Sequence, residues 1–324
     1  MTNTDHKTSS AKEKISLRLG FALICLLTWP LAWFPHSLGL PFGAFMGRLF
    51  FRLSARRRQI AVANIEMIKS HGTLPDDLIP ENIARESFAN FGRAAWETIV
   101  FFHRGLNHFL SFCQVEEGQE YLEEVLAQSR QSGRGIMMVT GHMGSWELMN
   151  QYLAHTFNYK MYAVGRNSGN LLADDLIRRL RTAAGNEYIP KDGGAMPMMA
   201  VLKKGALVGT LIDQAVIADG SGVPLPFLGR EATTNLGPVR LAHRTGATLI
   251  MVLFRRQGSK NFVKILPPLP PHPEMNRDEA AIADARALND RLSDHIVQYP
   301  DQWMWGHRRW KTRTGVHQNA DSIT

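Results

Sequence analysis

The chain has 324 residues, of which 44% are hydrophobic, and its formal net charge is +8 at pH 7. This length allows one large domain or two ordinary ones, and the hydrophobic content excludes a wholly disordered chain. The positive charge favours anionic partners: phospholipid head groups, phosphorylated substrates, acidic proteins or nucleic acid. The two cysteines do not predict a disulfide framework, because Cys25 lies in an apolar run; we therefore expect a reducing compartment.

A segment without Asp, Glu, Lys or Arg runs from Leu19 to Gly47. It is too long for the core of a signal peptide, and no small-residue cleavage site follows it. Its cleanest part ends at Trp29, which is short of the ~20 residues of a spanning helix unless the helix continues through Pro30. Basic residues flank the segment on both sides, so the charge asymmetry of a single span is weak. Two interpretations stay open: one bitopic helix, or a monotopic anchor in the cytoplasmic leaflet.

Three helices are predicted after this segment, at residues 56–70, 81–102 and 116–131. The second carries apolar and aromatic residues at helical spacing, which is typical of a core helix. The same pattern is compatible with the wall of a groove for an apolar ligand chain.

From residue 136 onwards, predicted strands and helices alternate. We expect strands at residues 136–140, 161–164, 188–189, 207–212, 248–254 and 262–266. We expect helices at residues 146–155, 171–182, 198–204, 235–244 and 278–297. The Gly- and Pro-rich residues 219–231 predict a loop, and the last two strands predict a hairpin. This alternation indicates an α/β fold with a central, largely parallel sheet flanked by helices.

The turn after the first of these strands carries His142, and Glu147 follows five positions later. On one ideal helix, five residues would set the two side chains roughly 140° apart. They can meet only if His142 lies in the turn and Glu147 in the first helical turn. Two glycines give the turn the required freedom, and Ser145 is a suitable N-cap. An imidazole held by a carboxylate is a general base; alternatively, Glu147 only complements the helix dipole.

Three predicted strands each lead into a polar residue: His142, Arg166 and Asp213. In open α/β sheets, ligands bind beyond the carboxyl ends of the strands, so these residues are expected to face one site. We place the strand before Arg166 beside the strand before His142. The alternatives are a solvated loop arginine at 166 and a strand-end cap at 213.

Other chemistries lack their motifs. The sequence has no G-x-S-x-G elbow, no G-x-x-x-x-G-K-[ST] loop, and neither H-E-x-x-H nor C-x-x-C. The 12 histidines are scattered, which disfavours zinc. Basic clusters occur, but no nucleic-acid-binding module accompanies them. A solvated face or a contact with anionic lipid explains these clusters better than nucleic acid does.

The stretch GHMGSWEL at residues 141–148 resembles the bacterial lipid A biosynthesis acyltransferases, and its H-x-x-x-x-[D/E] pattern is that of glycerolipid acyltransferases. The similarity continues through YAVGRN, LKKGALVGTLIDQ, VPLPFLGREATTNLGPVRLAHRTGA and QWMWGHRRWKTR. The N-terminal apolar segment, the arginine run and Asn64 also resemble that family, so nearly the whole chain is covered. One departure is the sequence MVLFRR at residues 251–256, where a proline often precedes the basic pair.

This resemblance implies an O-acyltransferase that moves a fatty acyl chain to a hydroxyl of a lipid A precursor. The donor would be the thioester of acyl carrier protein or acyl-CoA, without a metal or another cofactor. His142 would be the general base and Glu147 its orienting partner. Substrate binding is expected at Arg166, Asp213, Gly144 and Asn167. Two alternatives remain: a related acceptor, as in the phosphatidylinositol mannoside acyltransferases, or a lipid-binding membrane-surface protein without activity.

The expected location is the inner membrane, with the catalytic domain on the cytoplasmic side and in contact with anionic lipids. The expected partners are acyl carrier protein and a lipid A precursor or related glycolipid, but not nucleic acid. We expect a flexible basic N-terminus at residues 1–18 and an anchor or amphipathic segment at 19–53. The catalytic domain is expected at 54–315, followed by a tail at 316–324.

Overall fold

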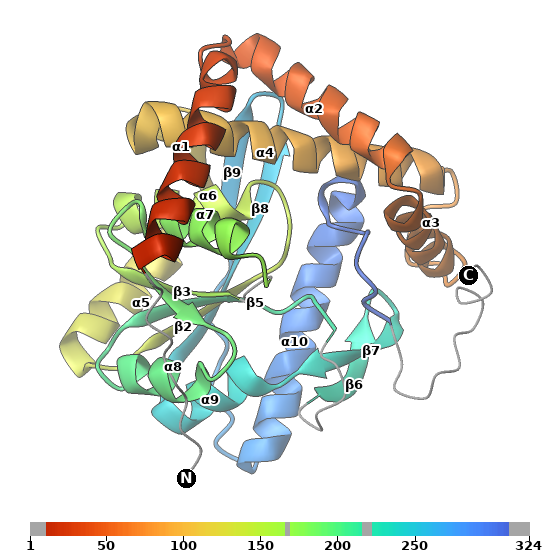
Figure 1. Ribbon diagram of the computed structural model, residues 1–324. Coiled ribbons are helices and arrows are strands. Elements are labelled where there is room, and N and C mark those ends of the chain that lie inside the picture. Colours follow the sequence, from red (N-terminus) through yellow and green to blue (C-terminus); the bar gives the residue numbers. More distant parts are fainter. Residues whose placement is uncertain (1–10, 166–168, 216–221, 311–324) are drawn as a thin grey trace.

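The computed structural model describes residues 11–165, 169–215 and 222–310. A seven-stranded sheet lies at its centre, with helices packed around it (Figure 1). The strands of this sheet, in spatial order, are β1 (Cys113–Glu117), β9 (Lys260–Ile265), β8 (Thr248–Gln257), β2 (Ile136–Thr140), β5 (Leu207–Leu211), β3 (Met161–Gly165) and β4 (Glu187–Pro190). Only the β8–β9 pair is antiparallel; the other neighbouring pairs are parallel. This arrangement confirms the expected α/β fold and the hairpin near the end of the chain.

The described helices surround this sheet. They are α1 (Ala11–Ala32), α2 (His36–Leu53), α3 (Ala55–Lys69), α4 (Pro80–Leu110), α5 (Gln119–Ser132), α6 (Trp146–Thr156), α7 (Leu171–Thr182), α8 (Ala195–Leu202), α9 (Gly237–Thr245) and α10 (Arg277–Gln298). In Figure 1, α1, α2 and α4 lie in the upper part of the molecule, where α4 crosses the upper ends of β8 and β9, and α8 and α9 lie in the lower part. The domain limits expected from the sequence stay a prediction.

Strand β2 is the most central element, and its pattern explains why. All five of its residues are buried. Alternate residues enter two separate cores, with Met137 and Val139 in one and Ile136 and Met138 in the other. A strand covered on both faces reads as a continuous apolar run, as this one does. Burial on both sides holds the carboxyl end of β2, and therefore the turn that follows it, in a fixed place.

The structure corrects three expectations. β5 lies between β2 and β3, so the strand before residue 166 is not beside the strand before His142. Residues 116–131 are not one helix, because β1 ends at Glu117 and Gly118, at φ 80°, turns the chain into α5. The expected loop at 219–231 overlaps a hairpin of β6 (Gly222–Phe227) and β7 (Arg230–Asn235), which extends beyond it.

Helix α2 packs on α4 through glycines. A Cβ at Gly47 would lie 2.1 Å from the carbonyl oxygen of Phe88, and one at Gly92 would lie 2.1 Å from that of Gly43. The two backbones therefore touch, as in helix pairs that pack through small residues. The opposite face of α2 exposes large apolar side chains, namely Leu38, Phe45, Met46, Phe50 and Leu53.

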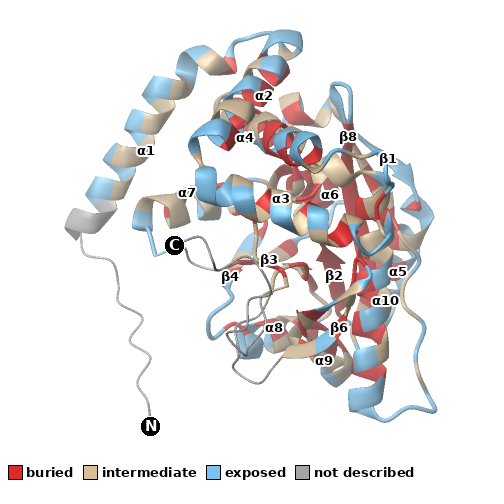
Figure 2. Cartoon of the chain, turned by 90° about the vertical axis from the view of Figure 1, so that its right-hand side faces the viewer, coloured by how far each residue is buried: buried red, intermediate tan, exposed pale blue. Residues whose placement is uncertain are grey.

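Helix α1 is largely exposed and projects from the body of the molecule (Figure 2). Among the described residues, Ile15–Ala32 is the one stretch of helix long and apolar enough to cross a membrane. The apolar segment from Leu19 to Gly47 is not continuous, because the chain turns between α1 and α2. The segment therefore supplies two different helices: α1, which is mostly exposed although it also contacts α4, and α2, which packs closely on α4.

Candidate active site

His142 and Asp213 meet beyond the carboxyl ends of two neighbouring strands. β2 and β5 are paired up to Thr140 and Leu211, and each residue follows its strand by two positions. The Nδ1 atom of His142 lies 2.7 Å from Oδ1 of Asp213. The backbone N–H of His142 donates to Oδ2 of the same carboxylate at 2.8 Å. The structure therefore brings together two of the three strand-end residues that the sequence predicts to share a site.

The environment of Asp213 keeps this carboxyl group ionised. Its side chain is only 2% exposed, and Trp303 donates its indole N–H to Oδ2 at 2.7 Å. Burial raises the pKa of Asp213, but the charge of His142 and the three hydrogen bonds outweigh it and lower the pKa to about 2. An ionised carboxylate only accepts hydrogen bonds, so Nδ1 of His142 carries the proton.

This assignment leaves the lone pair of His142 on Nε2. The side-chain amide of Gln214 lies 3.1 Å from that atom and donates to it in this tautomer. A substrate hydroxyl must take the place of this amide to reach Nε2. The histidine is thus held in the orientation of a general base, with its basic nitrogen on the side away from the carboxylate.

Glu147 does not bind His142. It lies in the first turn of α6, as expected, but both of its oxygens accept from Arg181 of α7, at 2.8 Å for the Nε bond. The guanidinium of Arg181 is buried, so this ion pair joins α6 to α7 below the turn. The hydrogen bond expected between His142 and Glu147 is therefore replaced by the bond to Asp213. The catalytic role of Glu147 stays a prediction.

A buried ion pair fixes the turn from the other side. Ser145 occupies the N-cap position of α6, but its hydroxyl donates to Glu97 of α4 and not to a helix amide. The side chains of Glu97 and Arg256 are 3% and 4% exposed, and Arg256 also donates to Ser145 at 2.9 Å. Asn261 donates to Glu97 at 2.9 Å. The basic pair of MVLFRR thus reaches the site through Arg256, whereas Arg255 binds Glu116.

The C-terminal segment closes the site. Trp303 pairs with Met143 in an isolated antiparallel bridge, and the N–H of Met304 donates to the carbonyl oxygen of His142 at 3.2 Å. Asn64 of α3 donates to the carbonyl oxygens of Trp305 and His307. Sequence similarity singled out both Asn64 and the Trp-rich tail, but no periodicity predicted that the tail would line the site.

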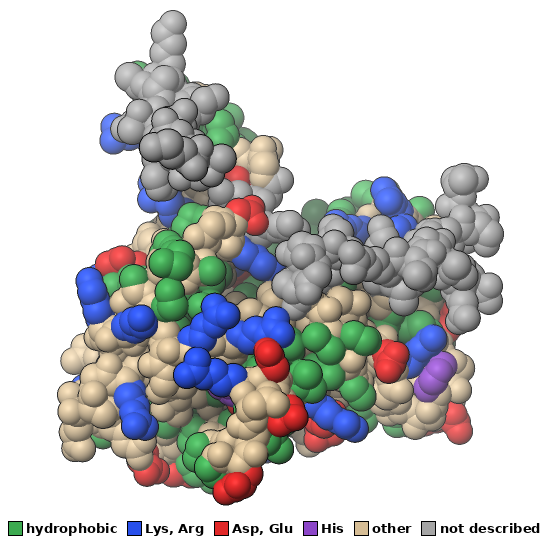
Figure 3. Space-filling view, turned by 90° about the horizontal axis from the view of Figure 1, so that it is seen from below, with side chains coloured by type: hydrophobic (Ala, Val, Ile, Leu, Met, Phe, Trp, Pro, Cys, Tyr) green, Lys and Arg blue, Asp and Glu red, His purple; other side chains and the backbone are tan. Residues whose placement is uncertain are grey.

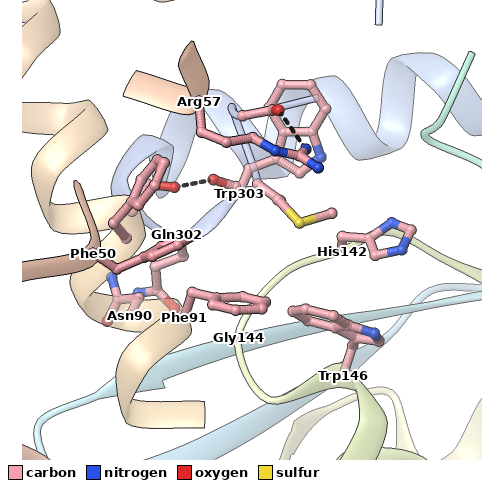
Figure 4. Close-up of a pocket in the computed structure, with 13 residues that line it drawn as sticks. Phe50, Arg57, Asn90, Phe91, His142, Gly144, Trp146, Gln302 and Trp303 are labelled. Atoms are coloured by element: carbon pink, nitrogen blue, oxygen red, sulfur yellow. Dashed lines mark hydrogen bonds between the residues drawn. The ribbon is translucent and has the colours of Figure 1, made fainter. Parts of the chain in front are cut away.

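A cavity of about 260 Å³ opens beside His142 (Figure 4). Its walls come from α2, α3, α4, the turn after β2, the start of α6 and the C-terminal segment. Its apolar side is formed by Phe50, Phe88, Phe91 and Trp146, and its polar side includes Arg57 and Asn90. The aromatic helix at 81–102 therefore does wall a cavity, as one of its two interpretations held.

Gly144 lines this cavity at φ 55°, a conformation that favours glycine. Asp213 lies behind His142 and is not a wall residue. Arg166 and Asn167 fall outside the described residues, so their substrate-binding roles stay predictions. Sequence reasoning did not single out Asn90 or Glu97, and it noted Arg57 only as part of the arginine run, without a role in the site. A charged residue inside the apolar pattern of α4 was the available signal for Glu97.

The fold and the site together define a class of protein: an α/β protein in which a carboxylate-held histidine borders an apolar cavity at the end of a parallel sheet. Such a site suits the activation of a hydroxyl next to an apolar chain. Residues 8–312 match the family model of the bacterial lipid A biosynthesis acyltransferases. The chain belongs to this family, and therefore to the enzymes that transfer acyl groups.

Curated relatives carry two kinds of name. The chain is 29% identical over 293 residues to the lipid A biosynthesis lauroyltransferase of Escherichia coli, and this match covers 88% of this chain and 89% of the relative. It is 28% identical over 280 residues to the lipid A biosynthesis palmitoleoyltransferase of the same organism, and this match covers 85% of this chain and 84% of the relative. It is 27% identical over 248 residues to the phosphatidylinositol mannoside acyltransferase of Mycolicibacterium smegmatis, with 75% of each chain covered.

Proposed function

We propose that this protein transfers a fatty acyl chain from the thioester of acyl carrier protein, or from acyl-CoA, to a hydroxyl of a lipid A precursor. The family membership supports acyl transfer, and the lauroyl- and palmitoleoyltransferase relatives support this acceptor. The observation that carries the mechanism is the 2.7 Å contact between His142 and the buried Asp213, beside an apolar cavity.

In the proposed reaction, the acceptor hydroxyl replaces the amide of Gln214 at Nε2 of His142. The histidine takes the hydroxyl proton while the oxygen attacks the thioester carbonyl carbon. The new C–O bond forms, the C–S bond breaks, and the thiolate that leaves accepts the proton from His142. Asp213 stabilises the imidazolium between these two steps, and its low pKa keeps it charged throughout.

The acyl chain is proposed to lie against the aromatic wall of the cavity. Phe88 is buried, while Phe50 and Phe91 are 51% and 46% exposed and stand at the outer side. Phe50 also belongs to the exposed apolar face of α2. Phe50 thus connects that face with the cavity beside His142. We propose that α1 and this face hold the protein at the inner membrane, with anionic lipids against its basic residues and the catalytic domain in the cytoplasm.

The first experiment replaces His142. The His142→Ala variant, purified at full length, should remain folded and lose at least ~10² in acyl-transfer rate, the lower range for a general base. The assay uses an acyl carrier protein thioester and a lipid A precursor, and it follows the mass increment of one acyl chain. Wild-type rates in the variant would contradict the general-base role of His142 and favour a lipid-binding protein without activity.

A second candidate acceptor is a phosphatidylinositol mannoside, because three relatives with this name are 25–27% identical to the chain. The two acceptors are compared by kcat/KM with one donor and one enzyme preparation. Mass spectrometry of lipids from cells with and without the gene gives an independent answer. An additional acyl chain on lipid A supports the main proposal, and one on another glycolipid supports the alternative.

A further inference from the structure

Arg57 lies in the wall of the His142 cavity but has no part in the proposed proton transfer. It belongs to the first turn of α3, and Figure 4 shows it across the cavity from Trp146 and Phe91. Its Nη1 atom donates to the carbonyl oxygen of Gly306 at 3.1 Å. This bond uses one of five guanidinium N–H donors and fixes the group at the cavity.

The segment around Arg57 carries positive charge that the described residues do not neutralise. Residues 48–65 include five arginines and no Asp or Glu. Arg48 is paired with Glu86 at 2.8 Å. In the described parts of the chain, no carboxylate forms an ion pair with Arg52, Arg56, Arg57 or Arg58. Of these four, only Arg57 lines the cavity.

The charge of Arg57 also reaches the catalytic region. His307, in the C-terminal segment, is affected by both sides of the site. Burial lowers the pKa of His307, Asp213 raises it, and the charges of His142 and Arg57 lower it further. Arg57 and His142 thus act on one common group. Both also line the same cavity, so one substrate molecule in it can touch both.

We infer that Arg57 binds a phosphate group of a substrate whose reacting atom lies at His142. This inference rests on the proposed function and adds a polar anchor to it. A planar guanidinium binds two phosphate oxygens at once, and such charge-assisted bonds are about twice as strong as neutral ones. The aromatic side of the cavity takes the apolar chain, and Arg57 on the polar side takes the anion. Two substrates can supply the phosphate: the acceptor lipid, or the phosphopantetheine arm of the donor.

The test compares Arg57→Ala with Arg56→Ala. Both variants lose one positive charge from the same helical turn, but only Arg57 lines the cavity. Figure 3 shows that Lys and Arg side chains are also present on the face seen from below, away from α2. The Arg56→Ala control therefore separates a specific effect of Arg57 from a general attraction of anions by the positively charged protein. Arg57→Ala should lower kcat/KM for the phosphorylated substrate roughly 10- to 100-fold, mainly through KM, and Arg56→Ala less than about 3-fold.

Substrates without phosphate identify the source. If the penalty of Arg57→Ala disappears with a dephosphorylated acceptor, the acceptor supplies the phosphate. If it disappears with an acyl-N-acetylcysteamine donor, which has no phosphate, the donor supplies it. An equal penalty on all substrates would overturn the inference and leave Arg57 a structural role through Gly306. Arg57→Lys keeps the charge but not the fork, and should recover only part of the loss.

A binding measurement makes the test independent of turnover. Trp146 and Trp303 line the cavity, so their fluorescence follows a ligand that enters it. The full-length protein in detergent is titrated with short-chain phosphatidic acid and, separately, with the matching diacylglycerol. Arg57→Ala should raise the Kd for the phosphatidic acid about 10-fold or more and leave the Kd for the diacylglycerol unchanged. Equal affinity of wild type and Arg57→Ala for phosphatidic acid would refute the inference.

The two proposals can fail separately. If the wild type shows no acyl transfer, that result counts only against the proposed function.

Discussion

Asp213 and Glu147 are the two carboxylates that could serve the histidine, and only Asp213 contacts it. Asp213→Asn keeps the shape of the side chain but lets an amide donate to Nδ1, which would move the proton to Nε2 and block the base. We expect a loss of about 10²-fold or more in kcat with little change in KM. Glu147→Gln should lower kcat by less than about 10-fold. The reverse order of the two effects would show that Glu147 serves the histidine during turnover.

The low pKa of Asp213 also predicts a pH dependence of stability. The folded-state pKa of about 2 lies below the ordinary value of 3.8, so the unfolded state binds the proton more tightly. The stabilisation is therefore complete above pH 3.8 and is lost as the pH falls towards about 2. It amounts to on the order of 2 kcal/mol. Urea unfolding of wild type and Asp213→Asn across this range measures it, and parallel pH profiles would contradict it.

The sequence predicted where His142 and Glu147 lie better than it predicted which carboxylate contacts His142. His142 lies in the turn and Glu147 in the first helical turn, both as expected from the glycines and the start of the helical pattern. Which carboxylate meets the imidazole depends on how β2 and β5 pair. The local sequence pattern predicts the strands but not their order in the sheet. Any two parallel strands bring their carboxyl ends to the same edge, so the pattern does not tell which two strands are neighbours.

At the scale of secondary-structure elements, the buried pair of Glu97 and Arg256 joins α4 to β8 and the turn after β2. Glu97→Gln leaves a buried guanidinium without its counter-ion, so we expect a loss of about 3–5 kcal/mol in the free energy of unfolding. Glu86→Gln is the matched control, because the pair of Glu86 and Arg48 is 32% and 41% exposed and should contribute less than about 1 kcal/mol. Denaturant unfolding measures both; equal losses would show that burial does not determine the contribution.

Helices and strands with a clear apolar pattern were predicted well, and irregular ones were not. The strand at 136–140 and the helix at 171–182 have the predicted bounds. The β6–β7 hairpin was missed because β6 contains Pro224 and Pro226, and because its turn begins with Leu228, a residue type that does not indicate the positive φ of 50° found there. Proline inside a strand and a branched residue at positive φ are both unfavourable signals. Pairing with the partner strand outweighs them here.

At the scale of the whole molecule, the two N-terminal helices differ in how far they are exposed. Deleting residues 1–47 would remove most of α2 and expose the glycine-packed face of α4. Deleting residues 1–33 removes only α1, which is mostly exposed. We expect this shorter deletion to move the protein out of the carbonate-resistant membrane fraction, while the catalytic domain stays folded by circular dichroism. Unchanged membrane retention would place the anchor elsewhere, with the exposed apolar face of α2 as the next region to alter.

The position of the C-terminal segment has a consequence for synthesis of the protein. Trp303 donates to the carboxylate that holds His142, and Asn64 binds the backbone two and four residues further along. None of these bonds can form before residues 303–307 have been translated and have left the ribosome. A nascent chain that already carries α1, α2 and the complete sheet therefore still lacks a finished active site. The acyl transfer proposed above therefore has to wait until residues 303–307 have left the ribosome.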